Sequence, residues 1–134
     1  MTNPKLDETR SWLAKAHQDL EVAAWLLESP QAFPAAVGFH SQQAAEKCLK
    51  AYLTWVEKPF EKIHSLVALV GMCLEFSSEF DLLRQAATTL TPYAVATRYP
   101  GDVPEISLDE AKSSVALAHQ IWDFIIVRLP GENT

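Results

Sequence analysis

The sequence lacks the short motifs that mark most familiar enzyme classes. It contains no glycine-rich phosphate loop, no HExxH zinc motif, no Asp-x-Asp metal pair and no GxSxG nucleophile elbow. Its two cysteines, Cys48 and Cys73, stand singly in apolar runs with no second sulfur or histidine at ligand spacing. We expect both to be buried, reduced thiols, and we predict no metal site, no cofactor and no catalytic residue of these classes.

Long apolar runs and net positive charge are also absent. The longest apolar run, residues 66–74, is far too short to span a bilayer, and the polar amino terminus has no signal-peptide core. With 17 Asp and Glu against 11 Lys and Arg, the chain has no overall positive field that would attract phosphate backbones. We therefore expect a cytoplasmic protein without membrane contact, and RNA is not favoured as its ligand.

No segment shows the two-residue alternation of a strand, and no internal repeat is visible. Helical periodicity and helix caps instead predict five helices. The first runs from Asn3–Pro4 to Ser29–Pro30, the second from Pro34 to about Val56, the third from His64–Ser65 to about Phe76, the fourth from Ser78 or Asp81 to near Pro92, and the last from the Ser107–Glu110 capping box to Pro130–Gly131. We predict one all-α domain over residues 1–134, an up-and-down bundle with a four-helix-bundle-like core.

Aromatic residues suggest a partner. Four tryptophans, Trp12, Trp25, Trp55 and Trp122, are many for one small core. Tryptophan is enriched where protein surfaces meet. The sequence therefore predicts a homodimer in which some of these side chains contact the second copy.

The second helix carries a polar stripe as well as an apolar one. His40, Gln43, Lys47 and Lys50 step by three or four residues and fall within an arc of about 80°. One interpretation is a solvated face on which Glu46 and Lys50 form an ordinary i,i+4 pair. The other is a groove wall that offers an amide, an imidazole and two ammonium groups to a phosphate or a partner helix.

Three strings in this order resemble one known family. They are AVGFHSQQAAEKCLKAYL at residues 36–53, KIHSL at 62–66 and TRYPGD at 97–102, and the likeness begins with AHQDLEVAAWLL at 16–27 in the first helix. Together they resemble the HEPN family, the higher eukaryotes and prokaryotes nucleotide-binding domain. The Gln-Ala-Ala-Glu-Lys string and its distance from the Arg-Tyr-Pro string are the specific features.

The resemblance implies a small helical bundle that commonly dimerises and often works beside a minimal nucleotidyltransferase, either as a separately encoded partner or as a fused helical domain. A pair of toxin–antitoxin type is one form that this partnership could take. In such pairs the catalytic metal site belongs to the nucleotidyltransferase, and the helical chain contributes nucleotide or substrate binding. This chain has no Gly-Ser followed by paired aspartates to hold the two magnesium ions of nucleotidyl transfer. We therefore expect a non-catalytic partner.

A second branch of the family consists of metal-independent ribonucleases. Their signature is an arginine followed, after four to six intervening residues, by a histidine near the start of the last helix. Counting from Arg98, those positions hold Val103, Pro104 and Glu105, so the signature is missing at the expected place. Arg10 and His17 have the spacing but lie in the first helix, and we interpret that match as accidental.

Arg98 nevertheless heads the candidate ligand residues. Held between Tyr99 and Pro100 in the loop before the last helix, it is placed to bind a phosphate or a carboxylate. The alternative is that Asp102 or another carboxylate pairs with it and fixes the loop. His64 adds weight to the ligand interpretation because a helix amino terminus beside it offers free amide hydrogens to an anion.

The leading hypothesis is thus a dimeric helical module that binds a nucleotide or a nucleotidyltransferase. Its candidate residues are Arg98, Tyr99, Asp102, His64, His40, Gln43, Lys47 and Lys50. Two alternatives remain open: a ribonuclease with a displaced histidine, and a purely structural dimer.

Overall fold

The computed structural model describes residues 3–94 and 106–131, and helices dominate this part of the chain. In order, the elements are α1 (Pro4–Glu28), α2 (Pro34–Trp55), α3 (Leu66–Cys73), the 3₁₀ segment η1 (Ser78–Leu83), α4 (Arg84–Leu90), the 3₁₀ segment η2 (Thr91–Ala94) and α5 (Leu108–Ile126). The described residues include no β-strand. The predicted all-α bundle is confirmed.

Local caps fix the helix starts that the sequence predicts. The Asn3 side chain accepts a hydrogen bond from the Leu6 amide at 3.2 Å, and Pro4 occupies the first turn of α1. The Ser107 hydroxyl accepts from the Glu110 amide while the Glu110 carboxylate accepts from the Ser107 amide, both at 3.1 Å. This reciprocal capping box starts α5 at the predicted position.

The third and fourth predicted helices differ in detail from the structure. The third, α3, ends at Cys73 and gives way to a turn over residues 74–76. The fourth begins as the 3₁₀ segment η1, capped by the Ser77 hydroxyl, and becomes α-helical only at Arg84. Because 3₁₀ turns are common at helix ends, sequence periodicity locates this element without specifying its first turns.

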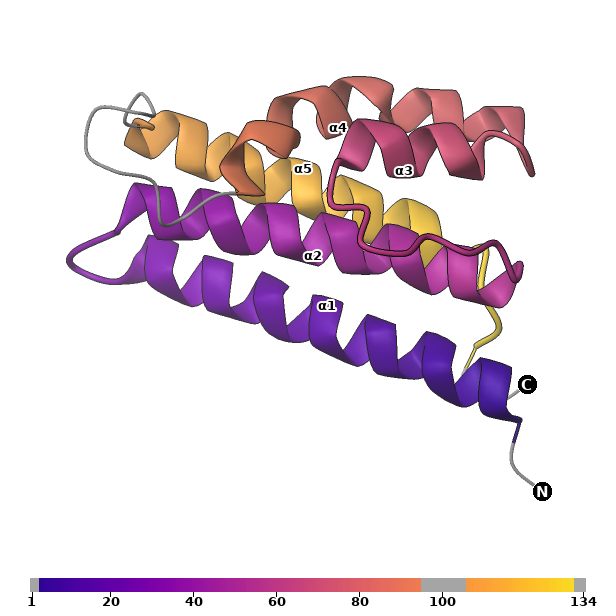
Figure 1. Ribbon diagram of the computed structural model, residues 1–134. Helices are drawn as coiled ribbons and strands as arrows, with labels where there is room; N and C mark the ends of the chain where they lie inside the picture. Colours follow the sequence, from indigo (N-terminus) through magenta and orange to yellow (C-terminus); the bar gives the residue numbers. More distant parts are fainter. Residues whose placement is uncertain (1–2, 95–105, 132–134) are drawn as a thin grey trace.

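Helix α2 is the central element of the bundle. Figure 1 shows α1 and α2 lying antiparallel, with α5 behind α2 and with α3 and α4 on the remaining side. Contacts with α1, α3, α4 and α5 surround α2. Small residues permit this close packing: Ala44, Ala45 and Ala51 are completely buried along it. As a consequence, polar residues of α2 are also enclosed.

One glycine of α2 marks an especially close contact. A Cβ atom on Gly38 would lie 2.9 Å from Cδ1 of Ile106 and 3.3 Å from Cγ of Tyr93. Tyr93 belongs to η2, and Ile106 is the first described residue after position 105. The missing side chain at Gly38 therefore lets the end of η2 and the start of the α5 region pack directly on α2.

The core is apolar and contains both cysteines. Tyr52 and Phe80 have ring centroids 4.6 Å apart, and Phe80 lies 5.0 Å from Phe124. Cys48 and Cys73 are free and buried, as predicted. Burial raises the pKa of the Cys73 thiol to about 12 and also raises the pKa of the Cys48 thiol. Both are therefore protonated, unreactive thiols at neutral pH.

Packing within the bundle accounts for three of the four tryptophans. Trp12, Trp55 and Trp122 are partly buried and pack against the core. Only Trp25, which is 72% exposed, stands largely in solvent. The number of tryptophans is therefore explained mainly by the bundle itself, and the homodimer stays a prediction. No helix in the described ranges is both long and apolar enough to cross a membrane.

Candidate functional site

Two buried carboxylates organise the polar residues of α2 and of the segments packed against it. Asp19 lies on α1 and is 8% exposed, and Glu46 lies on α2 and is 4% exposed. A buried carboxylate is costly unless charged or polar groups satisfy it. Each of these two carboxylates is satisfied by one lysine and one histidine.

The Asp19 cluster joins α1 to the first half of α2. Nδ1 of His40 lies 2.9 Å from Oδ1 of Asp19, and Nζ of Lys47 lies 2.5 Å from Oδ2. The two oxygens thus hold different partners, which stand seven residues apart on one face of α2. The lysine and histidine side chains remain partly exposed, at 23% and 29%.

The Glu46 cluster joins α2 to the segment before α3. Oε2 of Glu46 accepts from Nζ of Lys50 at 3.0 Å and lies 3.2 Å from Nδ1 of His64. Gln42 donates to Oε1 of Glu46 at 3.2 Å and also donates to the His64 carbonyl oxygen at 3.3 Å. Gln43 in turn donates to Oε1 of Gln42 at 2.7 Å. The cluster therefore holds both the backbone and the ring of His64.

The burial of Lys50 contradicts the interpretation of the polar stripe as a solvated face. Its side chain is 7% exposed, and its Nζ lies 5.6 Å from the ring centroids of both Trp12 and Phe60. The predicted i,i+4 pair with Glu46 exists, but it is buried. The physical reason is the central place of α2, because Trp12 from α1 and Phe60 from the connecting segment cover the end of the stripe.

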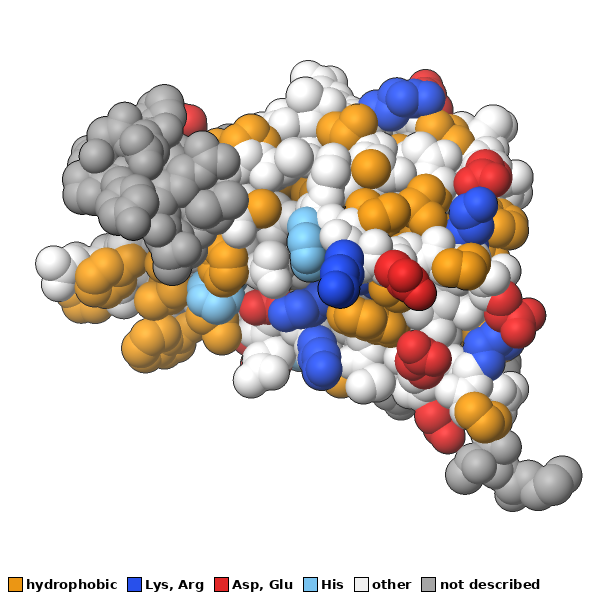
Figure 2. Space-filling view, viewed as in Figure 1, with side chains coloured by type: hydrophobic (Ala, Val, Ile, Leu, Met, Phe, Trp, Pro, Cys, Tyr) orange, Lys and Arg blue, Asp and Glu red, His pale blue; other side chains and the backbone are white. Residues whose placement is uncertain are grey.

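The outer edge of this network faces solvent. His64 is 68% exposed at its side chain, and Lys and His side chains gather on the face shown in Figure 2. Both imidazoles use Nδ1 for a carboxylate, which leaves Nε2 to meet another group. We call this surface, formed by Asp19, His40, Gln43, Glu46, Lys47, Lys50 and His64, the polar face.

The structure brings together five of the predicted site residues. His40, Gln43, Lys47, Lys50 and His64 all belong to the polar face. The other three candidates, Arg98, Tyr99 and Asp102, lie outside the described residues.

The sequence analysis did not identify Asp19 or Gln42 as site residues. It also did not predict that Glu46 is buried and holds Gln42, Lys50 and His64 together. Asp19 offered a signal, since it sits between Ala16 and Ala23 at helical spacing, where a charged residue needs a partner. Arg10 and His17, whose spacing we interpreted as accidental, engage other groups. Nη2 of Arg10 donates to the Gly131 carbonyl oxygen, and His17 pairs with Glu21 at 2.8 Å.

The charges of the polar face are nearly balanced. Two carboxylates stand against two ammonium groups, with an imidazole beside each carboxylate. Within residues 3–94 and 106–131, no group of three or more His, Cys, Asp or Glu side chains could hold a metal ion. The described part of the face is thus a set of oriented nitrogen donors around two buried carboxylates.

Comparison with known proteins places this helical bundle in a family. The model of the HEPN domain matches residues 9–129. The chain therefore belongs to the HEPN domain family, as the three sequence strings indicate.

Two solved structures have the same fold. TT1696 from Thermus thermophilus is 27% identical, with 90% of this chain and 98% of that chain covered and a TM-score of 0.71. The structure described as ST0689, an archaeal HEPN homologue, is 23% identical, with coverages of 90% and 96% and a TM-score of 0.72. The second likeness concerns the fold alone. No curated protein in the comparison matches the chain.

Proposed function

We propose that this chain is a non-catalytic nucleotide-binding module that acts beside a minimal nucleotidyltransferase. The observation that carries the proposal is the pair His64 and Glu46. The His64 side chain is 68% exposed, yet its Nδ1 is held by the carboxylate of Glu46, whose side chain is only 6% exposed. This contact orients the imidazole before any ligand arrives, which lowers the entropic cost of binding.

A phosphate group suits the donors of the polar face. An ammonium group has three N–H donors, so Lys47 keeps donors beyond the one that Asp19 accepts. Nε2 of His64 and Nε2 of His40 add nitrogen atoms that donate to phosphate oxygens when the imidazole carries both ring protons. We propose Arg98, Tyr99 and Asp102 as further ligand residues on the strength of the family resemblance.

The partner is proposed on the resemblance to paired HEPN proteins, including the toxin–antitoxin type of pair. Tagging the chain in its own host, purifying it gently and identifying stoichiometric companions by mass spectrometry tests this part. A nucleotidyltransferase in the eluate supports the pairing. Recovery of the chain without one contradicts it.

Nucleotide binding is tested by calorimetric titration with ATP. We expect saturable binding to the wild type, a dissociation constant raised at least tenfold in Lys47→Ala and His64→Ala, and unchanged ATP after long incubation. Lys58→Ala is the control for the first variant, because Lys58 pairs with Glu75 outside the polar face. His119→Ala on α5 is the control for the second. Equal losses in variants and controls would reject the site.

A ribonuclease is the second candidate, and the two carboxylate–histidine pairs favour it. An imidazole held at Nδ1 by a carboxylate is arranged to take a proton at Nε2. On RNA, Nε2 would take the 2′-hydroxyl proton, the 2′ oxygen would bond to phosphorus, and the bond from phosphorus to the 5′ oxygen would break. The leaving 5′ oxygen would take a proton from water. Metal-independent cleavage that is lost in Arg98→Ala and His64→Ala supports this candidate. Intact RNA at high protein concentration removes it.

We also propose that the module is a homodimer, as the family resemblance implies.

A further inference from the structure

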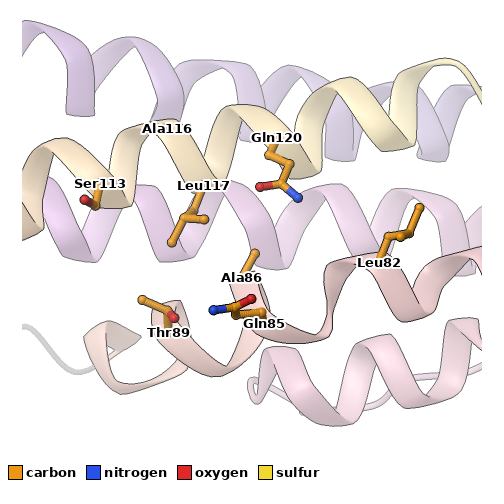
Figure 3. Close-up of a pocket in the computed structure, with 8 residues that line it drawn as sticks. All are labelled: Leu82, Gln85, Ala86, Thr89, Ser113, Ala116, Leu117 and Gln120. Carbon is orange, nitrogen blue, oxygen red and sulfur yellow. The ribbon is translucent and has the colours of Figure 1, made fainter.

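One completely buried amide lies behind the polar face. Gln42, on α2, has no exposed surface, whereas every other glutamine of the chain is at least partly exposed. Figure 3 shows two of the exposed ones, Gln85 on α4 and Gln120 on α5, which line a groove between these helices. Burying an amide is unfavourable unless its hydrogen bonds are made inside the protein. The partners of Gln42 therefore indicate what this side chain does.

Three hydrogen bonds fix the orientation of the Gln42 amide. Its Nε2 donates to Oε1 of Glu46 at 3.2 Å and to the carbonyl oxygen of His64 at 3.3 Å. A backbone carbonyl and an ionised carboxylate only accept, so the amide nitrogen has to face these two oxygens. Oε1 of Gln42 then faces Gln43, from which it accepts at 2.7 Å. Both N–H groups are used, and the amide has a single orientation.

Gln42 connects the two contacts that hold His64. It bonds directly to the His64 backbone, which lies in the non-helical segment between α2 and α3. It also bonds to Oε1 of Glu46, while Oε2 of the same carboxylate lies 3.2 Å from Nδ1 of the His64 ring. The position of an imidazole that is 68% exposed therefore depends on an amide that is completely buried.

The contact with Glu46 also selects the tautomer of His64. A neutral imidazole carries one N–H group, and a carboxylate accepts but does not donate, so the proton belongs on Nδ1. Nε2 of the neutral ring then has a lone pair, and it becomes a donor when the ring is protonated. In both states Nδ1 is bound to Glu46 and Nε2 is the nitrogen left for a ligand.

We propose that Gln42 is a positioning residue of the polar face. It holds Glu46 and the His64 backbone in one register, and it thereby keeps the neutral His64 ring as the Nδ1–H tautomer. Gln42 is completely buried and acts on a ligand only through His64. The consequence for binding rests on the proposed nucleotide site, whereas the effect on the His64 tautomer exists without any ligand.

The test is proton–nitrogen correlation NMR of the histidine side chains in the ligand-free protein at about pH 8.5, where an ordinary imidazole is neutral. In the wild type we expect mainly the Nδ1–H tautomer at His64. In Gln42→Met we expect a mixture that contains a large share of the Nε2–H tautomer. Methionine is similar in size but does not donate, so Glu46 and the His64 carbonyl both lose a partner.

Two controls accompany this measurement. His40 is the control within the same spectrum, because Asp19 holds its Nδ1 and its tautomer should not change in Gln42→Met. Gln85→Met is the matched variant, since it removes an exposed amide on α4. Calorimetric titration with ATP should give a dissociation constant raised at least about fivefold in Gln42→Met and unchanged in Gln85→Met.

The outcomes separate this inference from the proposed function. A wild-type His64 that is mainly the Nε2–H tautomer contradicts the inference without the use of any variant. An unchanged His64 tautomer in Gln42→Met, or an equal change at His40, also contradicts it, and thermal unfolding verifies that the variant is folded. An altered tautomer with wild-type ATP affinity contradicts the positioning role. If the wild type binds no ATP, the proposed function fails, and the tautomer of His64 still decides whether Gln42 holds the ring.

Discussion

Nδ1 of His64 lies 3.2 Å from Oε2 of Glu46, so a largely exposed imidazole is held by an almost fully buried carboxylate. The same oxygen accepts from Lys50. Glu46 therefore links the core of the bundle to its polar face. Changes at Glu46 are expected to affect stability and ligand binding together.

Replacing Glu46 with alanine should strongly destabilise the fold. The substitution leaves the buried Lys50 ammonium without its carboxylate, and breaking a buried pair in this way costs about 3–5 kcal/mol. Glu75→Ala is the matched control, because it removes an exposed pair with Lys58 that contributes less than about 1 kcal/mol. Urea unfolding measures both values. Similar losses in the two variants would show that the Glu46 network does not stabilise the bundle.

Gly38→Ala should destabilise the bundle by about 1–2 kcal/mol. The added methyl group meets Ile106 at 2.9 Å and Tyr93 at 3.3 Å, so both must shift. Gly71→Ala is the opposite case, since nothing lies within 4 Å of its new methyl group on α3. Because alanine favours helices over glycine, Gly71→Ala should stabilise by up to about 1 kcal/mol. Thermal unfolding distinguishes the two, and a loss in Gly71→Ala would contradict this account.

Ser107→Ala removes the cap of α5 and should cost about 1 kcal/mol. The Glu110 amide loses its acceptor, and the reciprocal bond loses its geometry. Ser113→Ala is the control, because Ser113 is exposed within the same helix and alanine is a better helix former there. Urea unfolding of both variants measures the two free energies of unfolding. A loss of stability in Ser113→Ala, with none in Ser107→Ala, would contradict the capping role of Ser107.

Stability should fall as the pH rises above about 9. Burial raises the pKa of the Cys73 thiol from 9.0 to about 12 and raises the pKa of Cys48 as well. The unfolded chain therefore releases these protons at lower pH than the folded chain, and the folded state loses up to about 1.4 kcal/mol per thiol for each pH unit. The raised pKa of Tyr52, caused mainly by burial, acts in the same direction above pH 10.

Urea midpoints between pH 8 and pH 11 measure this dependence. The control is Cys73→Ala, whose slope should be smaller than that of the wild type because one of the two thiols is gone. A wild-type stability that is flat or rises over this range contradicts the sign of the effect.

The fold could be predicted from sequence because its signals are local. Asn3 and Pro4 fix the start of α1, and Ser107 with Glu110 fixes the start of α5, each within one helical turn. The 3₁₀ geometry of η1 left no comparable signal, because the side-chain periodicity of Phe80 and Leu83 is compatible with a continuous helix.

The candidate site could be predicted only in part. Spacing on one helix located His40, Gln43, Lys47 and Lys50, but the burial of Lys50 depends on Trp12 and Phe60 from other segments. The same limit applies to Asp19, whose partners stand on α2. Which residues surround a helix is decided by tertiary packing, and periodicity does not contain that information.

The most direct test of nucleotide binding at the polar face is a histidine side-chain NMR titration with ATP. We predict saturable shifts of the His40 and His64 Nε2 resonances. The exposed His17 and His119 supply the control within the same spectrum and should stay unchanged. Equal small shifts of all four histidines, or no shift at millimolar ATP, would contradict the account.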